Sequence, residues 1–167
     1  MRKPLIVFGV LLVLLAVSMT PAGAKKPLDV RFDLTTYFAT PPDLATGSFT
    51  ASGDAVDEGV MCRDGTKADL APEKWAGNSD KVTNGQVLSE FTCTEGPLTG
   101  DTFIIKLQLH IPAESPTWTL NWTVMDGTGA FADLHGSGRG VGSVFFGPDG
   151  PPPIGASDVL TGGLHSK

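Results

Sequence analysis

The stretch TWTLNWTVMDGTGAFADLHGSGRG, residues 117–140, decides the fold class because it carries a strand, a turn and the start of another strand. Its apolar residues alternate with polar ones, which is typical of a half-buried β-strand. These alternating residues are Trp118, Leu120, Trp122 and Val124. Glycines at 127 and 129 tolerate positive φ and favour a reversal of the chain. We therefore expect a second short extended segment over 130–134 and a further turn over 136–138.

Similar alternation on both sides of this stretch predicts further strands. The expected segments are 30–38, 47–53, 56–62, 82–93, 102–111, 141–146 and 158–162. Residues 63–80 are polar and rich in helix and strand breakers, which favours a surface loop with one helical turn around 71–75 and with Trp75 packed on the barrel wall. Residues 147–153 are predicted to form an extended linker. About eight short strands without an amphipathic helix favour an antiparallel barrel or sandwich. Because closure removes exposed edges, we predict an all-β, single eight-stranded antiparallel β-barrel.

The amino terminus has the pattern of a secretory signal peptide. Arg2 and Lys3 precede a predominantly apolar run over 5–17, and Ala22-Gly23-Ala24 is an A-x-A cleavage site. The run is shorter than the roughly 20 residues of a transmembrane helix. The sequence thus predicts a signal peptide over 1–24, a linker over 25–28, a barrel domain over 29–165, and a secreted protein in the extracellular space or the periplasm.

Removal of 24 residues from 167 leaves 143, a length that suits one domain with a sizeable core. The processed chain has 10 Lys and Arg against 18 Asp and Glu, because only Arg2 and Lys3 leave with the signal, so its net charge is −8. An acidic surface repels phosphate backbones and anionic lipid. We expect neither a nucleic-acid partner nor stable membrane insertion after signal cleavage.

Cys62 and Cys93 are the two cysteines of the chain. An even count in an exported protein predicts a disulfide, which would stabilise the fold by roughly 3 to 4 kcal/mol in the chain-entropy model. A catalytic thiol and a metal pair are the alternatives. Neither is favoured, because no histidine or second cysteine pair stands nearby at zinc spacing.

The motifs of common catalytic and cofactor sites lack their context here. Residues 127–132, GTGAFA, fit the dinucleotide fingerprint, but no helix that would hold a pyrophosphate follows. His110, His135 and His165 show no metal-ligand spacing. No serine lies in a G-x-S-x-G motif, and the carboxylates of 54–64 are interpreted as solvated loop charges. We predict no metal, no cofactor and no catalytic residue.

Two neighbouring predicted strands supply the tentative ligand-binding residues. Because every second side chain of a barrel strand points inward, one apolar stripe would line the interior. Its members are Phe103, Ile105, Leu107, Leu109, Trp118, Leu120 and Trp122. The stripe fits either ordinary core packing or an apolar pocket, and the pattern alone does not separate the two.

Two segments, WTVMDGTGAFADLHGSG over 122–138 and GSFTASGDAVDEG over 47–59, resemble secreted bacterial proteins with an allene oxide cyclase barrel-like domain, a superfamily shared with plant dirigent proteins. The resemblance implies an eight-stranded antiparallel barrel of calycin type with an apolar cavity. In the plant relatives it implies oligomers that bind or steer hydrophobic substrates. No residue matches the polar and acidic groups of the plant active sites, so no catalytic role is carried over.

Three functions follow as hypotheses. The first is a non-catalytic barrel that binds a small apolar or amphipathic ligand, or a partner, with oligomers allowed. The second is a cyclase or isomerase acting on a hydrophobic substrate, which predicts a buried ionisable side chain with a strongly perturbed pKa beside a cavity of ligand size. The third is a structural or interaction protein, which predicts a filled barrel and an exposed apolar patch.

Overall fold

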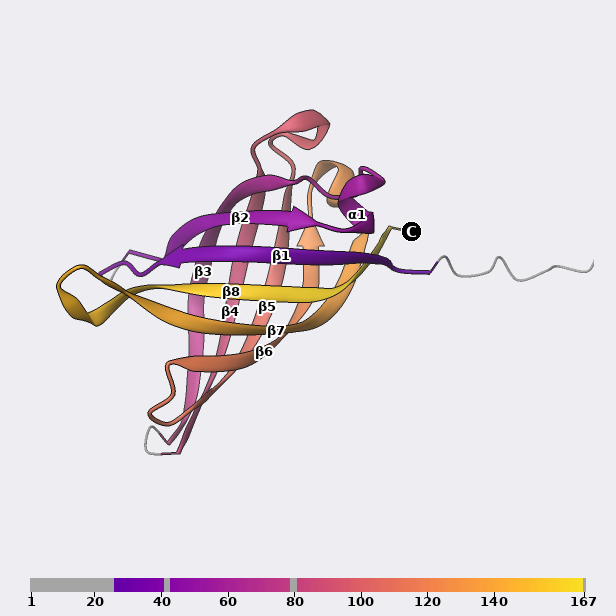
Figure 1. The fold of residues 1–167 in the computed structure, drawn as a ribbon. Coiled ribbons are helices and arrows are strands. Elements are labelled where there is room, and N and C mark those ends of the chain that lie inside the picture. Colours follow the sequence, from indigo (N-terminus) through magenta and orange to yellow (C-terminus); the bar gives the residue numbers. More distant parts are fainter. Residues whose placement is uncertain (1–25, 41–42, 79–80, 167) are drawn as a thin grey trace, which may run out of the picture.

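Eight strands form a closed antiparallel barrel in which every strand pairs with its neighbours in the sequence and β8 pairs with β1 (Figure 1). The computed structural model describes residues 26–40, 43–78 and 81–166. The strands are β1 (Leu28–Tyr37), β2 (Thr46–Ser52), β3 (Asp64–Asn78), β4 (Val82–Cys93), β5 (Thr102–Pro112), β6 (Thr117–Gly127), β7 (Leu134–Gly147) and β8 (Gly150–Ser166). The predicted eight-stranded antiparallel barrel is confirmed. The predicted signal peptide lies outside the described residues.

An aromatic core fills one half of the barrel. Phe32 of β1 is fully buried and lies at the centre of a group of rings whose centroids are 5.9 to 6.3 Å from its own. The surrounding rings belong to Phe49, Phe91, Phe103 and Trp122. Aromatic pairs at such separations add to the stabilisation from apolar burial. This half of the interior is a packed core.

Three short helical segments lie at the end of the barrel beside this core, in the upper part of Figure 1. They are α1 (Asp54–Asp57) and the 3-10 turns η1 (Gly96–Leu98) and η2 (Gly129–Phe131). The predicted disulfide is confirmed here: Cys62 and Cys93 are bonded, with their Cα atoms 5.9 Å apart. Disulfides are typical of oxidising compartments.

The strand predicted over 56–62 is wrong, because this segment contains the end of α1 and the turns after it. Gly53 has a φ of 103°, and its carbonyl accepts hydrogen bonds from the N–H groups of Val56 and Asp57. Ala55 is fully buried against the core. The apparent alternation therefore reflects one anchored helical turn.

The loop predicted over 63–80 is also wrong, since β3 runs from Asp64 to Asn78. Its backbone pairs with β2 on one side and with β4 on the other. The register with β4 shifts between Leu70 and Lys74, a bulge that contains Pro72, which has no N–H to donate. Pairing on both sides thus overrides the breaker-rich composition.

Glycines of β7 make room for tryptophans, and the turn predicted over 136–138 is wrong because these residues lie within the strand. A Cβ on Gly138 would lie 2.6 Å from Trp122 Nε1, and one on Gly142 would lie 2.3 Å from Trp118 Nε1. The glycines therefore serve close packing against the indoles. The extended segment predicted over 130–134 is likewise replaced by η2, with Leu134 beginning β7.

The last hairpin of the barrel is longer than the sequence indicates. The linker predicted over 147–153 is instead the tip of the β7–β8 hairpin, because β7 ends at Gly147 and β8 begins at Gly150. The closing strand predicted over 158–162 is part of β8, which spans 17 residues and pairs with both β7 and β1.

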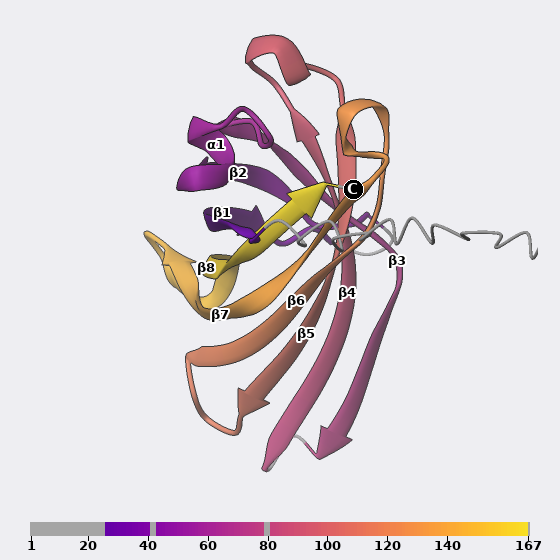
Figure 2. The ribbon, with the colours of Figure 1, turned by 90° about the vertical axis from the view of Figure 1, so that its right-hand side faces the viewer.

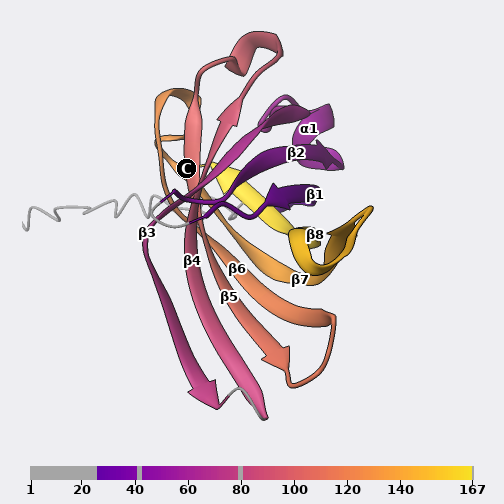
Figure 3. The same ribbon diagram turned by 90° about the vertical axis from the view of Figure 1, so that its left-hand side faces the viewer.

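The two ends of the barrel differ in shape. Figures 2 and 3 show β3, β4 and β5 spreading out at the end that lies away from α1. In Figure 1 the same strands run steeply behind β1, β7 and β8. Among the described residues, no helix is long and apolar enough to cross a membrane.

Candidate functional site

A cavity of about 310 Å³ occupies the half of the barrel that the aromatic core does not fill. Each of the eight strands, or a segment next to it, contributes a residue to the walls of the cavity. It is lined by Thr36, Phe38, Ala45, Lys67, Asp69, Glu73, Trp75, Val87, Leu107, Leu109, Ile111, Ser115, Trp118, Val144, Ala156 and Asp158. Phe38 and Trp75 are about half exposed, at 46% and 50%, so aromatic side chains stand where the cavity meets solvent. Cavities of about 300 Å³ and more hold small organic ligands.

A group of buried polar side chains, here called the polar cluster, lies at the cavity: Lys67, Asp69, Ser89 and Asp158. Lys67, Asp69 and Asp158 line the cavity, and Ser89 lies beside it, bonded to Asp69. Lys67 Nζ lies 2.5 Å from Asp69 Oδ1, and the same oxygen accepts a hydrogen bond of 2.6 Å from Ser89 Oγ. Lys67 and Asp69 alternate along β3, so both point inward. Buried charges are rarely kept without a partner, and this pair satisfies that requirement.

Asp158 joins the cluster from β8, which β1 and β2 separate from β3 in the closed barrel. Its Oδ1 accepts a hydrogen bond of 2.8 Å from Trp118 Nε1. Trp118 pairs with Gly142 in the sheet, and Gly142 pairs with Asp158. Because Gly142 has no side chain, the indole crosses the intervening strand and reaches the carboxylate.

Burial raises the pKa of Asp158 from 3.8 to about 6. The hydrogen bond from Trp118 and the positive charge of Lys67 oppose this effect, while the negative charge of Asp69 adds to it. Asp158 is only 6% exposed, so its ionised form loses most of its hydration. A buried carboxyl that titrates close to neutral pH can bind a cation or transfer a proton.

This pKa predicts that the contribution of Asp158 to stability falls as the pH rises. Below pH 3.8 the carboxyl is protonated in both the folded and the unfolded chain; between 3.8 and about 6 the folded chain binds more protons, and above about 6 both forms are ionised. The folded state therefore loses up to about 3 kcal/mol across this window. Urea unfolding of Asp158→Asn and of the wild type should show the variant gaining relative stability from acidic to neutral pH.

The exposed Asp57 of α1 provides the matched control for that experiment. Asp57→Asn removes the same formal charge at the other end of the barrel, and it should follow the wild-type pH profile. If Asp158→Asn and the wild type differ by a constant free energy of unfolding from acidic to neutral pH, the raised pKa is refuted.

The structure divides the seven residues predicted to bind ligand. Leu107, Leu109 and Trp118 line the cavity. The other four are buried and belong to the packed core: Phe103, Ile105, Leu120 and Trp122. A ligand-binding role of the seven residues stays a prediction.

The sequence patterns did not indicate the polar cluster. Lys67 and Asp69 fell in the predicted loop, and Asp158 was counted only as part of a short strand. Alternation along the strand could have predicted that Asp158 points inward. Asp158 is two residues from the fully buried Leu160, so the two side chains lie on the same face of the strand. Trp75, expected to pack on the barrel wall, does contact β4, since a Cβ on Gly85 would lie 2.3 Å from its ring.

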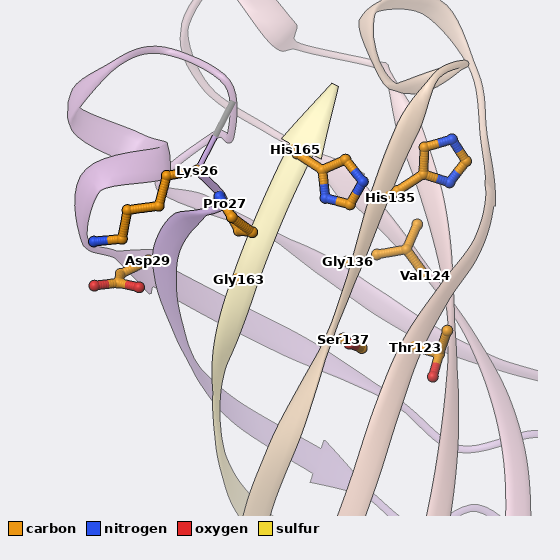
Figure 4. A pocket seen from close by; sticks show the side chains of 10 residues that line it. All are labelled: Lys26, Pro27, Asp29, Thr123, Val124, His135, Gly136, Ser137, Gly163 and His165. Carbon is orange, nitrogen blue, oxygen red and sulfur yellow. The ribbon is translucent and has the colours of Figure 1, made fainter. Parts of the chain in front are cut away.

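A second hollow, of about 550 Å³, lies on the outside of the barrel near the described N-terminal end (Figure 4). His135 of β7 and His165 of β8 are paired across the sheet, with ring centroids 5.5 Å apart. Lys26, Asp29 and His165 are exposed there. The hollow lacks a buried polar group, so the barrel cavity is the better candidate site.

Other candidate groups from the sequence do not converge in the described part of the chain. Asp54, Asp57 and Glu58 are exposed around α1, at the end of the barrel away from the cavity. Within residues 26–40, 43–78 and 81–166, no three His, Cys, Asp or Glu side chains are placed to hold a metal ion. The chemistry available inside the barrel is thus that of the polar cluster.

Comparison with known proteins adds no family assignment. No protein-family model matches this sequence, and a search of the curated proteins found no matching chain.

Proposed function

We propose that this barrel binds a small amphipathic molecule, with the apolar part against the cavity wall and a polar group against the polar cluster. The observation that carries the proposal is a cavity of about 310 Å³ that encloses Lys67, Asp69 and Asp158 within largely apolar walls. The proposal includes export to an oxidising compartment, which the Cys62–Cys93 disulfide supports.

The apolar wall of the cavity is the reason for proposing a ligand with an apolar part. Val87, Leu107 and Val144 face the cavity from three different strands, and Trp118 adds an aromatic surface. An apolar group that leaves water for this wall gains about 25 cal/mol per Å² of buried surface. The cavity volume suits a ligand of one or two rings.

The polar cluster is the reason for proposing that the ligand also has a polar group. A purely apolar ligand would leave the Asp158 carboxylate dehydrated without a new partner, which is costly. A ligand with one polar group restores that interaction. We therefore propose an amphipathic ligand in preference to a hydrocarbon.

A second candidate function is proton transfer on a bound substrate, as in an isomerase or cyclase. It is favoured by one observation, the pKa of Asp158 raised to about 6 beside the cavity. A general acid or base works best when its pKa lies near the operating pH. A related hypothesis is kinship with the allene oxide cyclase barrel-like proteins, for which the eight-stranded barrel is the supporting feature.

Binding of the uncharged fluorescent probe N-phenyl-1-naphthylamine tests the proposed ligand site. We expect the probe to saturate the wild-type protein and to quench or shift its tryptophan fluorescence, since Trp75 and Trp118 line the cavity. Ala156→Leu should weaken binding at least tenfold, because Ala156 is 5% exposed and lines the cavity, so a larger side chain there fills it.

Ala132→Leu is the matched control, because Ala132 is exposed and follows η2 at the other end of the barrel. This variant should bind the probe as the wild type does. Absence of saturable binding to the wild type, or equal affinity for Ala156→Leu, would contradict the proposed site.

A further inference from the structure

We infer that the polar group of the ligand is a cationic amine, held between Asp158 and Thr36. This inference rests on the proposed function and specifies the ligand class of the same cavity. It follows from the balance of charge in the cavity, from two acceptor atoms without a partner and from the aromatic rim.

The cavity holds more negative than positive charge. Lys67 is the cation among the described lining residues, and Asp69, Glu73 and Asp158 are the anions. Lys67 is already paired with Asp69 at 2.5 Å. When Asp158 is ionised, the lining has a net charge of −2, which repels an anionic ligand and attracts a cationic one.

Two oxygen atoms beside the cavity are free to accept hydrogen bonds, and one of them, Thr36 Oγ1, is fully buried. Asp158 Oδ1 is bonded to Trp118, and no hydrogen bond to Oδ2 is found among the described residues. Thr36 Oγ1 is buried without a hydrogen-bond partner in the same part of the chain, and Thr36 is 4% exposed. Buried polar atoms normally have partners, so an orphaned hydroxyl beside a cavity indicates a missing partner, and its lone pairs can accept from a donor on a ligand.

The sheet brings these two acceptors close to each other. Leu34, the pairing partner of Asp158, is two residues before Thr36 on β1. Thr36 and Asp158 are thus diagonal neighbours on the inner face, a spacing of roughly 7 to 8 Å between Cα atoms. One ammonium group between them can donate to both, because its three N–H donors point in different directions.

Aromatic side chains at the mouth suit the same ligand. Trp118 lines the wall beside Asp158, and Trp75 is 50% exposed at the rim. Trp75 Nε1 donates to Glu73 Oε2 at 2.9 Å, which places an anion beside the ring. Indole faces and carboxylates both favour an entering ammonium group over a carboxylate.

Calorimetric titration with three matched probes at neutral pH tests the inference. The probes are 4-phenylbutylamine, 4-phenylbutanol and 4-phenylbutyrate, which share an apolar body and differ in their polar group. We expect the amine to bind at least tenfold more tightly than the alcohol, since a hydrogen bond to a buried charge commonly contributes that much, and the carboxylate to bind most weakly. Asp158→Asn should reduce the amine to the affinity of the alcohol, whereas Asp57→Asn should leave the order unchanged.

Each other outcome is decisive. If the wild type binds the amine and the alcohol equally, or binds the carboxylate most tightly, the inference that the ligand is a cationic amine is refuted. Binding of N-phenyl-1-naphthylamine would still support the ligand site in that case. Preserved amine preference in Asp158→Asn overturns the role of Asp158. If neither the three probes nor N-phenyl-1-naphthylamine binds, the ligand site itself fails. The wild-type series decides the ligand class even if a variant does not fold.

Discussion

Lys67→Met is expected to lower the free energy of unfolding by about 3 to 5 kcal/mol, because it leaves a buried carboxylate without its cation. Lys67 is 4% exposed and Asp69 is 7% exposed, so water cannot replace the lost partner. Removal of Lys67 also removes a charge that opposes the raised pKa of Asp158. Urea unfolding at neutral pH measures the loss.

A double-mutant cycle tests whether the loss of stability in Lys67→Met comes from breaking the pair of Lys67 and Asp69. Asp69→Leu alone should also destabilise the fold, since it leaves the ammonium of Lys67 and the hydroxyl of Ser89 unpaired. The double variant Lys67→Met with Asp69→Leu should recover most of the loss, because both charges are then absent. Losses that simply add in the double variant would refute a buried, mutually dependent pair.

Arg31 and Asp33 provide the matched control for this cycle. They form an ion pair of the same i, i+2 spacing on β1, but their side chains are 50% and 44% exposed. Solvent screens such a pair, so the same neutralising changes at these positions should alter stability little. Asp69→Asn is the milder variant if Lys67→Met does not fold, and it should still destabilise the protein more than Asp33→Asn does.

Phe32→Ala is expected to cost about 3 to 5 kcal/mol, the range of large-to-small changes in packed cores. Phe32 is fully buried and contacts a group of four aromatic rings that come from β2, β4, β5 and β6. Alanine there leaves a cavity that rigid neighbouring rings fill poorly. Thermal and urea unfolding measure the change.

Phe146→Ala is the control for this prediction, because Phe146 lies near the end of β7 and is 48% exposed. It should cost clearly less than Phe32→Ala. Native domains are commonly stable by only about 5 to 15 kcal/mol, so Phe32→Leu serves as a milder test and should give an intermediate loss. Equal losses for Phe32→Ala and Phe146→Ala would show that the aromatic group is not the core of the fold.

The sequence by itself determined the fold class and the inner face of several strands. Alternation over 30–38, 102–111 and 117–124 reflects a sheet with one buried face, which is a local property of the chain. The burial patterns of β1 and β6 follow that alternation. The pairing of Cys62 with Cys93 was also predictable, because a chain with two cysteines allows one intramolecular disulfide and the amino-terminal pattern predicts export.

Local patterns failed where pairing between strands overrode composition. The segment over 63–80 is rich in polar residues and breakers, yet β2 and β4 satisfy its backbone from both sides. The glycines of β7 resembled turn residues, but they lie under Trp118 and Trp122. Both errors have one physical cause: the free energy that decides these conformations comes from neighbours distant in the sequence.

Only the tertiary structure decided the candidate site. Lys67, Trp118 and Asp158 come from β3, β6 and β8, and closure of the barrel brings them to one cavity, where Ser89 of β4 supports Asp69 by a hydrogen bond. These side chains are buried by residues from the other strands of the barrel, and this burial raises the pKa of Asp158. Hydrophobic periodicity reports which face of a strand is buried, whereas the cost of burying a charge is set by everything that surrounds it.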